Sequence, residues 1–68
     1  MKNYVDLDKL EKVPKGILFG YRDVVDDTLD NSEHSKYGEV FKSQVEEGLI
    51  NNVTIEKETD ARMLYKKL

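Results

Sequence analysis

The chain has no cysteine and only one histidine in 68 residues, and this limits how its fold can be stabilised. A core of this size rarely contributes more than about 3–5 kcal/mol of net stability. Disulfides and structural zinc sites, the usual additional supports, need cysteines or several histidines. Association is the support that remains, so we predict a homodimer.

The composition favours one folded domain. Apolar residues make up 38% of the chain and charged residues 37%, and the apolar ones recur regularly, which is typical of a folded protein. A single proline and the absence of repeats or Gly/Ser linkers predict one small domain, residues 1–68. No apolar run is long enough for a secretion leader or a membrane span, so we expect a cytoplasmic protein without a membrane partner.

The N-terminal half predicts a short strand at residues 4–7, one or two helical turns ended by Pro14, and then a helix. In residues 14–30 the apolar positions follow the i, i+1, i+4, i+7, i+8 spacing of one helix face. Gly16 and Gly20 each cost roughly 1 kcal/mol inside a helix. A strand is therefore the alternative for the first part of this segment, with one face formed by Ile17, Phe19 and Tyr21.

The C-terminal half predicts a helix, a strand and a last helix. Residues 33–48 carry the clearest helical pattern, with N-cap residues before it and Gly48 as its stop. The β-branched alternation of residues 53–56 predicts a strand, which pairs with residues 4–7 or with its copy in a second subunit. Thr59 is the expected N-cap of a helix over residues 60–68.

These elements define an α+β fold that is mainly helical. It has about three helices, at residues 14–30, 33–48 and 60–68, with short strands at 4–7 and 53–56. An all-α fold is the alternative.

The net charge of −3 is unevenly distributed. Residues 1–22 contain five basic and three acidic side chains. Residues 23–47 contain two basic and eight acidic ones, and residues 48–68 contain four basic and three acidic ones. A helix over residues 14–30 would place four carboxylates on one face, because they stand at i, i+3, i+4 and i+7. They are Asp23, Asp26, Asp27 and Asp30.

Four like charges on one helix face oppose its stability, which favours a functional explanation. They would bind a basic protein partner or imitate the phosphates of a nucleic acid. The alternative is an ordinary solvated face opposite an apolar stripe. A calcium site fits poorly, because its loop motif is absent.

No catalytic, metal or cofactor motif is evident. His34 lies near Ser32 and Ser35, but sequence adjacency does not assemble a nucleophile, a base and an orienting acid. A surface or capping role is the better interpretation of His34. We predict that the protein is not an enzyme and that it holds no cofactor or metal.

The leading functional hypothesis is a small regulator or inhibitor, of the phage or mobile-element type, that acts through protein contacts. The alternative is a DNA-binding transcriptional regulator that uses basic residues near both chain ends and the strand at 53–56 as part of a wing. Its candidate contacts are Lys9, Lys12, Lys15, Arg62, Lys66 and Lys67.

Overall fold

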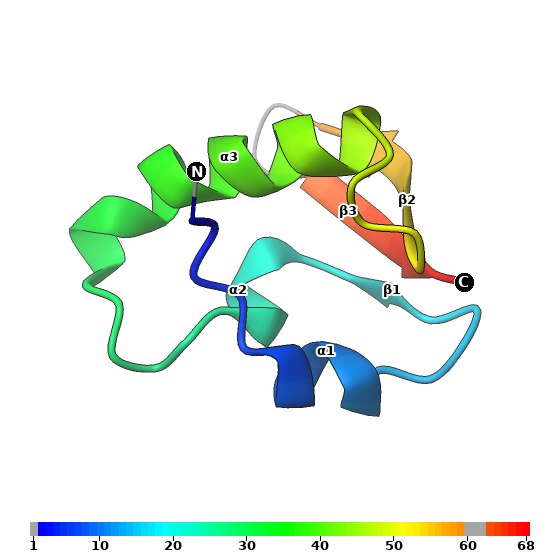
Figure 1. The fold of residues 1–68 in the computed structure, drawn as a ribbon, viewed down its shortest axis with the longest axis horizontal. Coiled ribbons are helices and arrows are strands. Elements are labelled where there is room, and N and C mark those ends of the chain that lie inside the picture. Colours follow the sequence, from blue (N-terminus) through cyan, green and yellow to red (C-terminus); the bar gives the residue numbers. More distant parts are fainter. Residues whose placement is uncertain (1, 60–62) are drawn as a thin grey trace.

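A computed structural model describes residues 2–59 and 63–68 of the chain. It combines helices with a three-stranded antiparallel sheet, which confirms the α+β class but not a mainly helical fold, and overturns the all-α alternative (Figure 1). The elements in chain order are α1 (Leu7–Lys12), β1 (Leu18–Phe19), α2 (Tyr21–Val24), a 3₁₀ turn η1 (Asn31–Glu33), α3 (His34–Glu46), β2 (Val53–Glu58) and β3 (Met63–Lys67).

Strand β3, the last element of the chain, lies in the middle of the sheet. The strand order is β1-β3-β2, with Phe19 of β1 and Ile55 of β2 both opposite Tyr65. A bulge between Ile55 and Lys57 shifts the β2–β3 register. Since β2 pairs within its own chain, its backbone needs no second subunit on this side.

One face of the sheet packs against the helices. Tyr65 is 1% exposed, and its ring lies 5.7 Å from Phe19 of β1 and 4.8 Å from Phe41 of α3. The same core includes Leu10 of α1 and Val24 of α2, with α2 between α1 and α3 in Figure 1. Burial raises the pKa of Tyr65 to about 12, because the phenolate would lose its hydration there.

The predicted helix over residues 33–48 is confirmed as α3. Its inward residues Phe41 and Val45 are buried four positions apart, as the periodicity requires. Gly48 ends it with a φ of 78°, a left-handed conformation that other residues adopt at a cost, and its N–H donates to the Val45 carbonyl (3.1 Å).

The predicted helix over residues 14–30 is wrong. Gly16 has a φ of 84° and turns the chain into β1, and Gly20 forms the N-cap of the four-residue helix α2. The decisive residue is Phe19, which was not on the expected helical stripe but is 4% exposed in the core. The strand alternative is confirmed only for Leu18–Phe19.

The predicted helix over residues 60–68 is also wrong where the structure describes it. Residues 63–67 form β3, with Tyr65 and Lys67 buried and their neighbours Leu64 and Lys66 only partly buried. Pairing with one strand on each side outweighs the helical spacing of the apolar residues, because it satisfies the backbone groups along both edges of β3. Residues 60–62 lie outside the described part of the chain.

The two predicted strands differ in outcome. The strand at 53–56 is confirmed and extends to Glu58, but its partner is β3 rather than residues 4–7. Residues 4–7 form no strand: Val5 makes one bridge to Val25, and Leu7 already begins α1. The expected helical turns before Pro14 are present as α1.

Lys67 joins the last strand to the first helix. Its side chain is buried, with 7% of the residue exposed, and its Nζ donates to the carbonyls of Leu10 (3.0 Å) and Val13 (3.2 Å) at the end of α1. Carbonyls in the last turn of a helix lack intrahelical partners and carry partial negative charge. The ammonium group therefore caps α1 at its C-terminus.

Replacing Lys67 should consequently destabilise the fold. We expect Lys67→Met, which keeps most of the aliphatic stem but removes the donors, to lower the free energy of unfolding by about 1–3 kcal/mol. The measurement is urea denaturation followed by circular dichroism. Lys66→Met, on the adjacent position of β3, is the control and should change stability by less than about 0.5 kcal/mol. Equal effects of the two variants would contradict the capping role.

Candidate partner-binding surface

The N-terminal segment pairs with the loop that follows α2. Val5 forms an antiparallel bridge with Val25. Beside this bridge, the N–H groups of Asp6 and Asp26 donate to carbonyls of the opposite segment, at 2.8 and 2.9 Å. The start of α1 is therefore held next to residues 26–28.

Tyr4 turns the chain into this pairing. Its φ of 59° is in the left-handed region, which costs a non-glycine residue roughly 1–3 kcal/mol. Its carbonyl accepts the hydrogen bond from Asp26, and its ring contacts that of Tyr37 edge-on, with the centroids 4.4 Å apart. These contacts offset the strain and keep the segment in place.

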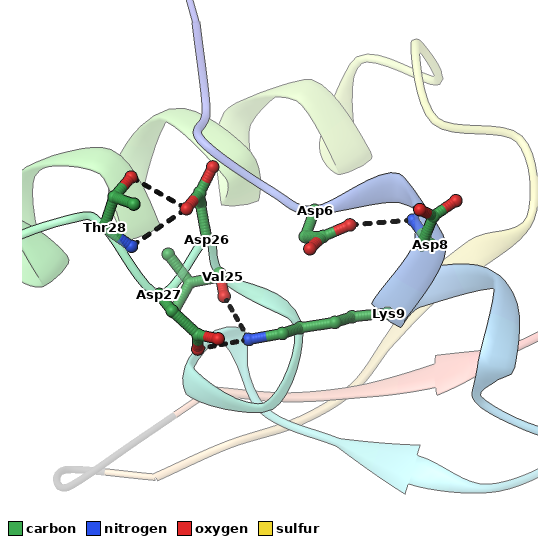
Figure 2. Close-up of polar contacts among 7 residues, drawn as sticks. All are labelled: Asp6, Asp8, Lys9, Val25, Asp26, Asp27 and Thr28. Atoms are coloured by element: carbon green, nitrogen blue, oxygen red, sulfur yellow. Dashed lines mark hydrogen bonds and ion pairs between the residues drawn. The ribbon is translucent and has the colours of Figure 1, made fainter.

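The pairing brings carboxylates from two parts of the sequence to one side of the molecule: Asp26 and Asp27 from the loop after α2, and Asp6 and Asp8 from the start of α1 (Figure 2). Asp8 and Asp27 are exposed, whereas Asp6 and Asp26 are half-buried. We call these four aspartates the acidic surface. Lys9 is the one basic side chain drawn among them, and its Nζ pairs with Asp27 and donates to the Val25 carbonyl (3.0 Å).

Local hydrogen bonds hold the carboxylates of Asp6 and Asp26 in place. Asp6 is the N-cap of α1 and accepts from the N–H of Asp8 (2.9 Å). Asp26 accepts from both the N–H and the hydroxyl of Thr28, at 2.9 and 2.8 Å, and these bonds lower the pKa of its carboxyl group. The hydrogen bond to Asp27 raises the pKa of Lys9, helped by the charges of Asp27, Asp6 and Asp26. The carboxyl group of Asp26 is therefore ionised at neutral pH.

The geometry inferred for the four aspartates of residues 23–30 is wrong, because no helix spans them. Asp23 lies at the start of α2 and accepts from the N–H of Gly20 (2.8 Å). Asp30 precedes η1 and accepts from the N–H of Ser32 (3.0 Å), which lowers the pKa of Asp30. Only Asp26 and Asp27 join the acidic surface.

Sequence reasoning missed Asp6 and Asp8 as members of this surface. Asp8 lies in the first turn of α1, and the N-cap of this helix is Asp6. A search for a capping aspartate immediately before the first apolar helical position, Leu7, would have found it.

The candidate nucleic-acid contacts differ in their surroundings. Lys9 is paired with Asp27, and Lys67 is buried beneath α1. Arg62 lies outside the described residues. Lys12 and Lys15 are exposed near the end of α1, and Lys66 lies on β3 beside Leu18 of β1.

An apolar groove with a volume of about 470 Å³ begins beside the acidic surface. Leu10 and Phe41, both buried, contribute to its lining from α1 and α3. Leu7 and Leu49 also line it, although 74% and 68% of these residues are exposed. Two large apolar side chains thus face solvent along one groove.

A second, more polar hollow lies between α2, α3 and β2. His34, Glu39 and Lys42 line it, and the Nζ of Lys42 pairs with Glu58 at 3.2 Å, which raises the pKa of Lys42. The ring of His34 meets that of Tyr21 edge-on at 6.1 Å. Charges of both signs border this hollow, so it does not select one charge of ligand.

Within residues 2–59 and 63–68, no cluster of three or more histidine, cysteine or carboxylate side chains is arranged to bind a metal ion. None of the helices described has the length and apolar character to span a membrane. Comparison with protein families, with curated proteins and with solved structures finds no match for this chain.

The hydrogen bonds to Asp26 lead to a pH-dependent prediction. The pKa of its carboxyl group should lie below the ordinary value near 3.8, and Thr28→Val, which removes the hydroxyl donor, should raise it part of the way back. Because the pKa is lowered on folding, this carboxylate stabilises the fold above pH 3.8, and that contribution is lost as the pH falls through the folded value.

A carbon-detected NMR titration of the aspartate carboxyl groups measures both variants directly. Asp30 is the internal control, because its pKa is lowered by Ser32 and should be unchanged in Thr28→Val. An ordinary pKa for Asp26 in the unmodified chain would contradict the hydrogen-bonding scheme.

Proposed function

We propose that this chain is a cytoplasmic, non-catalytic protein-interaction module whose acidic surface binds a basic protein partner as a small regulator or inhibitor. The supporting observation is the pairing of residues 4–6 with residues 24–26. This pairing brings Asp6 and Asp8 to Asp26 and Asp27, with Lys9 offsetting one of their charges.

Clustered carboxylates attract a basic partner at long range and set its orientation at contact. A carboxylate that accepts one or two local hydrogen bonds still has lone pairs for a lysine or arginine donor. The acidic surface is also built in advance, since backbone bonds and the cap of α1 hold it. A partner would therefore bind without first ordering the side chains of Asp6, Asp26 and Asp27.

The test reverses the charge of Asp8 and neutralises that of Asp27. Asp26 closes the turn with Thr28 and Asp6 caps α1, so Asp8→Lys combined with Asp27→Asn alters the acidic surface with less effect on folding. With a fluorescent oligolysine as the probe, we expect low-salt binding that weakens about tenfold in this variant. Fluorescence anisotropy measures the affinity, and circular dichroism checks the fold.

Glu47→Lys combined with Glu56→Gln is the matched control, with the same change in net charge at two exposed positions beyond α3. It should weaken binding by less than about threefold. Equal losses in the two variants would mean that net charge, and not the acidic surface, determines binding. Absence of oligolysine binding at low salt would refute the proposal.

DNA binding is the second candidate, and the β2–β3 hairpin beside α3 supports it. The exposed residues of α3 include Glu39 and Glu46 as well as Lys36, so that helix offers a phosphate backbone both repulsion and attraction. On the leading proposal we expect no anisotropy change with a fluorescent DNA duplex at about 50 mM salt. Binding that is lost in Lys12→Glu and Lys66→Glu would favour the DNA-binding alternative instead.

A further inference from the structure

Two of the leucines that line the apolar groove are largely exposed and contribute little to the packing of the core. Leu7 lies between Asp6 and Asp8 at the start of α1, and Leu49 follows the end of α3. Their exposure, 74% and 68%, exceeds that of the other large apolar residues exposed in the described chain. The groove between them has a floor of buried core residues and a volume within the usual range for binding sites, roughly 300–1,000 Å³.

We propose that this groove binds the apolar face of a basic amphipathic helix. The inference rests on the proposed function and specifies the kind of partner. Charge complementarity supports it, because Leu7 is flanked by two aspartates and Glu11 of the same helix also lines the groove. A helix that places leucines in the groove would bring lysines or arginines on its flanks to these carboxylates.

A helix fits this groove better than an added strand. Strand addition needs backbone groups without partners along an edge. Around the groove, the N–H of Leu49 donates to the Gln44 carbonyl (2.9 Å), and the carbonyl of Asn52 accepts from Leu68 (2.9 Å). The carbonyl of Leu10 is bound by Lys67. An occupant of the groove would therefore be bound through side-chain contacts, as when the apolar face of a helix packs into a groove.

The same charges disfavour a second copy of this chain as the occupant. A two-fold symmetric contact uses the same patch on both copies, so the carboxylates of Asp6, Asp8 and Glu11 would be present twice in one interface. Like charges brought together in this way oppose association. A basic partner removes this repulsion and replaces it with attraction.

The experiment compares three fluorescent probes by anisotropy. Two are Leu/Lys peptides of equal composition and about 14 residues, roughly four helical turns; one has its leucines at helical spacing and the other alternates them. The third is the oligolysine used above. We expect the helical peptide to bind at least about tenfold more tightly than either of the others, because only it presents leucines on one face while its lysines meet the rim.

Single substitutions assign the binding to the groove. Leu7→Ser and Leu49→Ser should each weaken the helical peptide about tenfold and leave oligolysine binding unchanged, since both leucines are exposed and neither carries a charge. Leu18→Ser is the matched control: Leu18 is 49% exposed on β1, is not part of the groove, and should have no effect.

The possible failures are distinguishable. If the helical peptide and oligolysine bind equally and the leucine variants match the unmodified chain, the groove inference is overturned while the acidic-surface proposal stands. If no probe binds at low salt, both fail. A doubling of the mass in light scattering that is lost in Leu7→Ser would show a second copy in the groove and would also overturn the inference.

Discussion

The docking of α1 is the constraint on which the rest of the site depends. A six-residue helix is far below the length of roughly 12–15 residues at which an isolated helix becomes even marginally stable in water. It persists because Leu10 is buried in the core, Asp6 caps its N-terminus, and Lys67 of the last strand caps its C-terminus. Its formation therefore requires the central strand β3 and the N-terminal bridge together.

This dependence joins the stability of the fold to its candidate function. Lys67 supplies positive charge inside the molecule, where it stabilises helix carbonyls and is not available to a partner. Asp6 does two things, since it caps α1 and contributes to the acidic surface. Leu7 and Asp8 then point outward from a helix that is fixed at both ends. A recognition surface can in this way be built from few residues on a small core.

The sequence was sufficient where local patterns determine structure. Helix α3 and strand β2 were predicted because their periodicity and their flanking residues agree. Residues 14–30 and 63–67 were misassigned because their apolar spacing also satisfies a helix, and only partners far along the chain decide otherwise. Tyr65 is opposite both Phe19 and Ile55, and neither pairing leaves a local signal in residues 60–68.

The candidate site shows the same division. The excess of acidic residues in the middle of the chain was visible in the sequence. Asp6 and Asp8, however, come next to Asp26 and Asp27 only through the bridge between Val5 and Val25. Lys67 was proposed as a nucleic-acid contact because it is one of the basic residues near the chain ends. Its burial follows from the alternation of β3, which places it on the same side as Tyr65.

Native-state amide hydrogen exchange tests most directly whether α1 and the bridge form one preformed surface. The amide of Leu10, which donates to the Asp6 carbonyl, and the amides of Asp6 and Asp26 should exchange much more slowly than in an unfolded chain. Protection of all three, together with that of Tyr65 in β3, is the expected result. Unfolded-chain rates at these three amides while Tyr65 stays protected would show α1 undocked, and would contradict a preformed binding surface.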